Sequence, residues 1–336
     1  MSESEPIQAR APKRQRTKLL VRLVGPLLLI IVLYRIRLEK DAIGALLSAD
    51  ILPLLAALLL NILNNWLKVL RWDVLLAARG HHYDRKRAWT SFLSSVYVGM
   101  LTPGRVGDVL RAQYLKHDLG MPYAEGIAVI VVDRLCDLYV LIAFVALGIA
   151  RFSSVLVGRL ALMTWVLVLL TALGPLLLFI PGVAQRSMRA LYRKLPGDPT
   201  GAAFDRFLTA LKAQRLPHLI QAVVLTTLAF CVNYLQGYLL AGAMHIDLAF
   251  YDVVCLLAIA SLLGLLPISI SGIGVRELFF SLVFPVLGHS PASGVVYGIG
   301  IFLIIYVAVV LMGLVSWHIA PPPLETDQGQ SEKKPR

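Results

Sequence analysis

The chain has few charged residues and few cysteines for its length. Only 15% of its 336 residues are Asp, Glu, Lys or Arg, whereas 58% are hydrophobic; soluble domains average about 25% charged residues. The three cysteines lie inside apolar runs without CxxC spacing, which argues against a disulfide framework or a cysteine-based metal site. The sequence also lacks a nucleophile elbow, a P-loop, an HExxH helix and a Rossmann glycine pattern in the contexts that they require. We therefore expect no enzymatic chemistry, no metal ion and no cofactor.

Long apolar runs take the place of these motifs. A helix needs about 20 consecutive apolar residues to cross a bilayer, and several runs approach that length. The fold class that follows is an all-α polytopic membrane protein with about six full transmembrane helices. The expected spans cover residues 19–34, 51–72, 127–150, 160–180, 219–244 and 294–317.

The net charge of +12 indicates membrane topology rather than nucleic-acid binding, because the basic residues stand between apolar runs. The Lys- and Arg-rich stretches are residues 1–18, 68–88 and 181–217. The stretches 38–50 and 245–252 are neutral or acidic. The positive-inside rule then places both chain ends in the cytoplasm. We predict disordered cytoplasmic tails at 1–18 and 319–336, and a single membrane domain at 19–318 in the cell inner (plasma) membrane.

Two stretches put a Pro/Gly break into an apolar region and then place a cation and a carboxylate close by. They are residues 101–111, LTPGRVGDVLR, and residues 266–278, LPISISGIGVREL. Lipid cannot satisfy the backbone groups that such a break frees, so the break must face protein or water. The arms on either side are too short to span a bilayer. We therefore predict two broken re-entrant helical hairpins, the first entering from the cytoplasmic side and the second from the opposite side.

The breaks carry groups that suit a phosphate. Glycine lets the backbone turn with positive φ, and a helix that restarts there points its N–H groups and positive dipole end at the break. Arginine adds a planar fork that matches phosphate. The candidate lipid-phosphate-binding residues are Arg105, Arg111, Arg276, Gly104, Gly272 and Gly274. The residues expected to support the hairpins are Asp108, Glu277, Pro103 and Pro267.

A purely structural interpretation of the same residues is also open. Asp108 and Glu277 fall in first helical turns, where a carboxylate caps backbone N–H groups in any case. Arg111 stands three residues after Asp108, at the spacing of an ion pair within a helix.

Polar residues inside the predicted spans form a second set of candidates, which would line a cavity. They are Asn65, Lys68, Arg71, Asp133, Arg134, Asp137 and Asn233. Lys68 and Arg71 could instead extend to the cytoplasmic interface. Asp133 and Asp137 share a helix face, either in a charge cluster coupled to protons or in a structural ion pair with Lys68 or Arg71, which we favour. For Asn233 we favour a helix–helix hydrogen bond over a ligand contact.

Together these residues resemble the transmembrane region of the lysylphosphatidylglycerol synthases, the flippase-like family also called the UPF0104 group. The resemblance rests on Asn65 with Lys68, Arg71 and Trp72, on 103–111, on Asp133 with Arg134, and on 267–277. It covers about residues 20–318. The family usually has Glu where this chain has Asp108, so the carboxylate is kept with a shorter reach.

The resemblance implies a helical bundle with two re-entrant hairpins and a cavity for an anionic lipid. Members with a soluble aminoacyl-transferase domain resemble flippases for aminoacylated phosphatidylglycerol. This chain ends soon after its last expected span, so we expect a stand-alone member that is not itself a synthase.

We accordingly expect a protein that moves an anionic, phosphate-bearing lipid across the inner membrane, whether that lipid is aminoacylated, glycosylated or polyprenyl. The alternative is a non-transporting scaffold or regulatory partner of a lipid-modifying enzyme or glycosyltransferase, with the basic stretch 181–217 as its docking surface. The sequence leaves open the lipid, the direction and energy source of transport, and the oligomeric state.

Overall fold

The computed structural model describes residues 48–101, 107–154, 158–173, 202–265, 272–321 and 323, and these residues form helices and connecting turns without a strand. The predicted first span and most of both predicted tails lie outside this part of the chain. The helices are α3 (Ile51–Ala77), α4 (Arg85–Leu101), α5 (Val109–Leu119), α6 (Tyr123–Arg151), α7 (Gly158–Leu173), α9 (Ala202–Lys212), α10 (Leu216–Ala243), α11 (Phe250–Leu263), α12 (Val275–Val283), the 3₁₀ turn η3 (Phe284–Leu287), α13 (Pro291–Ile301), the π segment η4 (Phe302–Val307) and α14 (Ala308–Ile319).

Three helices are long and apolar enough to cross a membrane among the described residues. They are α3, α10 and the continuous helix Pro291–Ile319, which joins α13, η4 and α14 and is called the last span below. Helix α6 has 29 residues, but its first half carries Asp133, Arg134 and Asp137. Helix α7 covers the first part of the predicted span 160–180, whose remainder lies outside the described residues. The all-helical membrane fold is therefore present, while the count of six spans stays a prediction.

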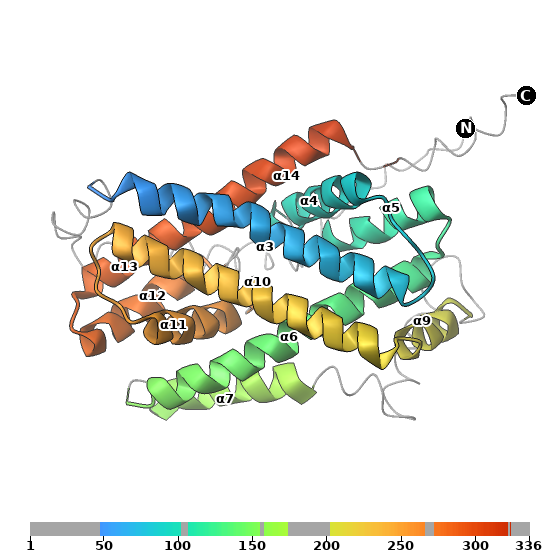
Figure 1. Cartoon of the computed structure of the whole chain (residues 1–336). Helices are drawn as coiled ribbons and strands as arrows, with labels where there is room; N and C mark the ends of the chain where they lie inside the picture. The colour runs from blue at the N-terminus through green and yellow to red at the C-terminus, as the bar shows by residue number, and fades with distance from the viewer. Residues whose placement is uncertain are drawn as a thin grey trace, which may run out of the picture.

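Helices α3 and α10 run antiparallel along each other through the length of the molecule (Figure 1). Side-chain amides join them: Asn64 donates to the carbonyl of Ala229 at 2.7 Å, and Gln236 donates to that of Ala57 at 2.8 Å. Such bonds hold helices together where lipid offers no hydrophobic driving force between them. The outward faces of both helices expose apolar side chains, as contact with lipid requires: Ile51, Leu52, Leu55, Leu59, Ile62, Ile220, Val224 and Leu228.

The two predicted hairpins correspond to α4 with α5 and to α11 with α12. These helices have 17, 11, 14 and 9 residues, so each is shorter than the roughly 20 residues of a span. Figure 1 shows the two pairs toward opposite ends of α3 and α10, as entry from opposite sides predicts. The turns at 102–106 and 266–271, which include Pro103, Gly104, Arg105 and Pro267, lie outside the described residues.

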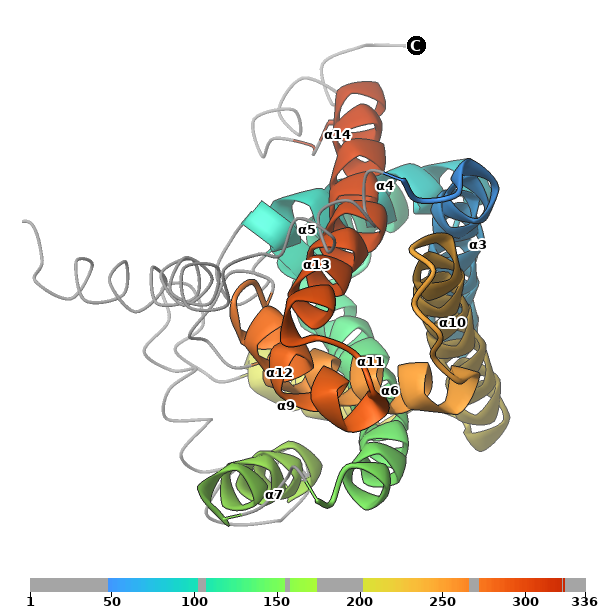
Figure 2. The same ribbon diagram turned by 90° about the vertical axis from the view of Figure 1, so that its left-hand side faces the viewer.

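Each hairpin packs into its own hydrophobic core. The first core gathers α3, α4, α6 and α9 around Trp72 and Phe92. The second gathers α11, α12 and α13 around Phe280 and Tyr297 (Figure 2). Helix α14 also packs against α4, and a Cβ added to Gly313 would lie 2.7 Å from the Leu93 carbonyl oxygen. Only glycine allows that approach, so the last span connects the second core to the first hairpin.

Helix α9 lies within the stretch 181–217, which the sequence analysis treats as a basic loop. Its Phe204, Phe207, Leu208 and Leu211 are buried, and the helix packs on α6. Their spacing of three and four residues is that of an amphipathic helix, a signal that the basic character of the stretch obscured.

The base of the first hairpin is closed by a group that we call the hairpin clasp: Tyr83, Arg87 and Asp118. The Tyr83 hydroxyl donates to Asp118 Oδ2 at 2.5 Å, and Arg87 Nε donates to the same oxygen at 2.9 Å. Burial alone would raise the pKa of the Asp118 carboxyl, but the hydrogen bonds from Arg87, Tyr83 and the His117 ring hold that pKa below its ordinary value. The clasp thus joins the start of α4 to the end of α5 through a carboxylate.

We predict that Asp118→Asn lowers the free energy of unfolding by about 1–2 kcal/mol at neutral pH, since it removes charged hydrogen bonds. A carboxyl whose pKa is depressed in the folded state stabilises the protein at neutral pH, and this contribution disappears as the pH falls below about 4. Thermal unfolding in detergent should therefore converge for the two proteins in acid. The exposed Asp247→Asn is the matched control, and a stability gap that persists unchanged in acid would contradict this account.

Candidate functional site

A buried ion pair connects the first hairpin to the bundle. Arg71 of α3 places Nε 2.7 Å from Asp133 Oδ1, and Arg111 of α5 donates through Nη1 to Asp133 Oδ2 at 3.0 Å. None of these three residues is exposed. Arg71 Nη1 also donates to the Thr226 hydroxyl of α10 at 2.9 Å. The carboxylate of α6 therefore holds arginines from two other helices, as a buried charge requires.

Three further residues complete what we call the charge cluster: Asp108, Arg134 and Asp137. Arg134 contacts Asp133 Oδ2 at 3.0 Å, Asp137 Oδ2 at 3.1 Å and Asp108 Oδ2 at 3.4 Å. Asp137 also pairs with Arg71. With three arginines and three aspartates, the cluster has no net charge.

The Arg111 guanidinium also lies against the Trp72 and Phe92 rings, 5.7 and 5.2 Å from their centroids. Nη1 is hydrogen-bonded to Asp133 and Nη2 lies 3.5 Å from Asp108 Oδ1, while Nε and Nη2 have no hydrogen-bond partner among the described residues. This geometry indicates that Arg111 fixes α5 against α6 and α3, which is the structural role left open by the sequence.

The second hairpin restarts as α12 at a glycine turn. Gly272 and Gly274 have φ angles of 79° and 87°, which L-residues with a Cβ rarely adopt. The Gly274 N–H donates to Glu277 Oε2 at 2.6 Å, so this carboxylate caps the helix. The other oxygen, Oε1, accepts from Arg276 Nε at 3.1 Å and from Nη2 at 2.5 Å. Arg276 and Glu277 are 4% and 1% exposed, so the pair is almost entirely enclosed.

Two rings of the last span cover the Arg276 guanidinium. Its carbon lies 5.8 Å from the Phe302 centroid and 5.3 Å from that of Tyr306, and the two rings stack on each other. Both rings stand on the π segment η4, and the Asn61 amide of α3 donates to the carbonyl of Ile304 in that segment at 2.8 Å. A π segment inside an α-helix is rare and is frequent at functional sites.

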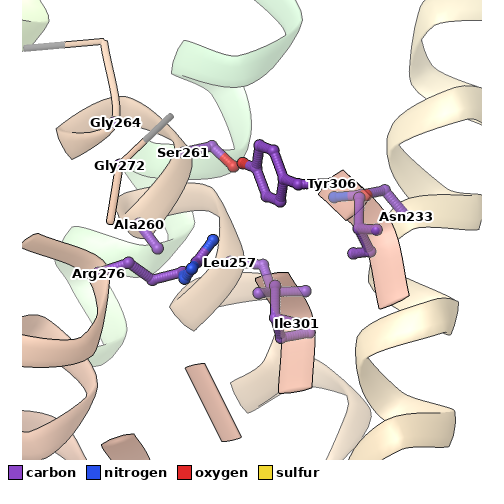
Figure 3. Close-up of a pocket in the computed structure, with 10 residues that line it drawn as sticks. Asn233, Leu257, Ala260, Ser261, Gly264, Gly272, Arg276, Ile301 and Tyr306 are labelled. Carbon is purple, nitrogen blue, oxygen red and sulfur yellow. The ribbon is translucent and has the colours of Figure 1, made fainter. Parts of the chain in front are cut away.

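Arg276 lines a pocket between α10, α11, α12 and the last span. Figure 3 shows Arg276 and Asn233 reaching into it from opposite sides, with the Tyr306 ring near Ser261. The cavity itself is small, about 20 Å³, which is room for about one water molecule; the larger space of about 350 Å³ includes the open mouth. The lining residues are Asn233, Leu257, Ala260, Ser261, Gly264, Gly272, Arg276, Ile301, Ile305 and Tyr306. Six of the ten lining residues are apolar or glycine, and the others are one cation and three neutral polar side chains.

The structure divides the residues that the sequence singled out. Arg276, Gly272 and Asn233 line the pocket, with Gly274 and Glu277 behind Arg276. Six other residues that the sequence singled out form the charge cluster: Arg71, Asp108, Arg111, Asp133, Arg134 and Asp137.

The polar residues of the second half of α3 are mostly buried within the protein: Asn61, Asn64, Asn65 and Arg71. The Asn65 amide donates to the carbonyl of Asn61, while Lys68 on the same helix is half-buried. No described contact joins Arg111 to Arg276, and the two arginines have separate sets of partners. The sequence analysis missed Ser261, Phe302 and Tyr306; the aromatic pair four residues apart in the last span was the only signal available for them.

Comparison with known proteins identifies the family of this chain. The family model described as lysylphosphatidylglycerol synthase TM region matches residues 20–313. This chain belongs to that family. A UPF0104 membrane protein of Methanocaldococcus jannaschii is 26% identical over 231 residues, which cover 67% of this chain and 94% of the relative. This member of the lysylphosphatidylglycerol synthase TM region family is thus an integral, multi-pass membrane protein.

The charge cluster of this family member generates a stability prediction. Asp133→Asn leaves Arg71 and Arg111 buried with a neutral partner, and loss of one partner from a buried ion pair costs about 3–5 kcal/mol. We expect a correspondingly large fall in thermal stability in detergent. Asp137→Asn is the matched comparison and should cost less, because its side chain is 26% exposed. Equal losses for the two variants would show that burial does not set the cost.

Proposed function

We propose that the protein moves an anionic, phosphate-bearing lipid between the leaflets of the cell inner membrane, and that Arg276 holds the lipid phosphate. The observation that carries this proposal is the placement of Arg276: a buried arginine at the restart of a broken helix, facing a pocket. Charged residues at membrane depth are costly and usually serve function.

The guanidinium has one nitrogen available for a ligand. Nε and Nη2 donate to Glu277, and among the described residues Nη1 makes no hydrogen bond or ion pair. The rings of Phe302 and Tyr306 cover the group without using its N–H donors. In this proposal a phosphate oxygen binds at Nη1, and the lining residues move apart to admit the rest of the headgroup, because the cavity itself is only about 20 Å³.

The remaining walls suit a lipid headgroup. Asn233, Ser261 and the Tyr306 hydroxyl offer neutral donors and acceptors, which can bind ester oxygens or hydroxyl groups. Leu257, Ile301 and other apolar residues can contact the glycerol and the first acyl carbons. This division into an apolar body and a few polar groups is typical of small-molecule sites.

The two hairpins support transport rather than static binding. Broken helices that enter from opposite ends of a bundle are the arrangement by which many transporters expose one site alternately to each side. In this proposal the charge cluster fixes the first hairpin, and the second hairpin carries the headgroup.

We predict that Arg276→Ala reduces lipid translocation in reconstituted liposomes at least tenfold while the protein remains folded, since no other described lining residue is a cation. Translocation would be followed with fluorescent phosphatidylglycerol and dithionite quenching of the outer leaflet. The matched control is Arg85→Ala, an exposed position at the start of α4 far from the pocket.

Unchanged translocation in Arg276→Ala would sink the site assignment. Absence of translocation in the wild type, together with co-purification of a lipid-modifying enzyme or glycosyltransferase, would favour the non-transporting scaffold. Deletion within 181–201 sharpens the distinction, because a scaffold that docks through this stretch would lose its partner whereas a transporter should keep its activity.

A further inference from the structure

The pocket has a charge balance that a bound phosphate would upset. Arg276 carries +1 and Glu277 carries −1, and both are buried, so the empty site is neutral. The other described lining residues carry no formal charge. A phosphodiester brings −1. With both side chains ionised, the filled site would hold one net negative charge beside a buried ion pair, which is unfavourable.

Glu277 has no room to remove its charge by swinging into water. Its Oε2 is held by the Gly274 N–H at 2.6 Å. Its Cγ and Oε1 lie 3.1 and 3.3 Å from the position that a Cβ would occupy on Gly298 of the last span, so the side chain is packed against that helix. The carboxyl must therefore stay where it is when a ligand arrives at Arg276.

A proton on Oε1 resolves the conflict. Oε2 can still accept the Gly274 N–H when the carboxyl is neutral, so the cap of α12 is preserved. The phosphate is then the only negative charge that balances the Arg276 guanidinium. The net charge of the site is zero before binding, with Arg276⁺ and Glu277⁻. It is also zero after binding, with Arg276⁺, phosphate⁻ and protonated Glu277.

We propose that the pocket binds a singly charged phosphodiester headgroup together with one proton from solvent, which Glu277 takes up as the lipid binds and releases when the lipid leaves. This inference rests on the proposed function, because it assumes that Arg276 receives the phosphate. It assigns the ligand class as well: a phosphomonoester or diphosphate dianion would again leave the site with excess negative charge.

The titratable groups around Glu277 leave it as the proton acceptor. The last span brings Tyr297, whose hydroxyl donates to the Gly237 carbonyl at 3.0 Å, and Tyr306 over Arg276. Helix α11 brings Cys255 and Asp252, and Asp252 is paired with Arg151 at 2.6 Å. From helix α10, Asn233 lines the pocket and does not titrate. The 3₁₀ turn η3 has no titratable residue. His289, which follows η3, is hydrogen-bonded to the Asp247 carbonyl.

The test is isothermal titration of the purified full chain in detergent with short-chain phosphatidylglycerol, in two buffers of different ionisation enthalpy and across pH 5–8. We expect about one proton taken up per lipid bound by the wild type. Since the filled site holds one more proton than the empty site, raising the pH should weaken binding, by up to about tenfold per pH unit.

Two variants test whether Glu277 is the group that takes up the proton. Glu277→Gln keeps an oxygen for the Gly274 N–H but removes the negative charge, so lipid should bind with no proton uptake and without pH dependence. Glu125→Gln makes the same chemical change at the start of α6, outside the pocket, and should behave as wild type. Short-chain phosphatidic acid, a phosphomonoester, should bind the wild type at least tenfold more weakly than phosphatidylglycerol at pH 8.

The outcomes separate this inference from the proposed function. Binding that is lost in Arg276→Ala but proceeds without proton uptake in the wild type overturns the inference and leaves the proposed function standing. Proton uptake that persists in Glu277→Gln also overturns it, because another group then takes the proton. Failure of the wild type to bind phosphatidylglycerol at any pH overturns both. The wild-type proton count stays decisive even if Glu277→Gln does not fold.

Discussion

A charge that folding removes from water must find its counter-charge within the protein, and the described part of this molecule is arranged around that constraint. Moving an ion into the interior costs several kcal/mol even after relaxation. Arg71 and Arg111 meet that cost through the same carboxylate, Asp133, on a helix between them. Helices α3, α5 and α6 can therefore pack only in an arrangement that brings these three side chains together. The position of the first hairpin follows from this requirement.

The two buried arginines that follow the helix breaks satisfy the same constraint in different ways. Arg111 is neutralised by a carboxylate on another helix, so its ion pair contributes to tertiary structure. Arg276 is neutralised by Glu277, the next residue on its own helix. Removing the first interaction would take away the contact that joins α5 to α6, whereas loosening the second affects one helix turn. A local pair can exchange its partner for a ligand without separating the bundle, and for this reason the proposed function places the ligand at the pocket rather than at the charge cluster.

The sequence predicted those features that depend on local chemistry. Pro/Gly breaks flanked by arms too short to span predicted two pairs of short helices, which are present as α4 with α5 and α11 with α12, while their re-entry from opposite sides of the membrane stays a prediction. Helical spacing placed Asp133 and Asp137 on one face near Arg71. It could not predict that Arg111 and Arg276 would have separate partners, because this depends on how deeply each hairpin enters the bundle. The roles of Phe302 and Tyr306 depend on a π segment, whose register is set by tertiary contacts such as the Asn61 bond to Ile304. Helix α9 was missed for a different reason. The sequence contains its helical apolar spacing, but the many basic residues around it led to the prediction of a loop.

Charge balance also bears on which lipids such a site can distinguish. Gly264 and Gly272 bring backbone to the pocket wall, with the Gly264 Cα 3.4 Å from where a Cβ on Gly272 would lie. In the proposed function, few side chains line this part of the wall, so recognition would rest on the charge at the phosphate more than on the group esterified to it. Hydroxylated headgroups such as glycerol or a sugar leave that charge unchanged, whereas an aminoacyl group adds a cation for which the described lining offers no carboxylate. Binding of a cationic headgroup would therefore require an acidic residue outside the described lining.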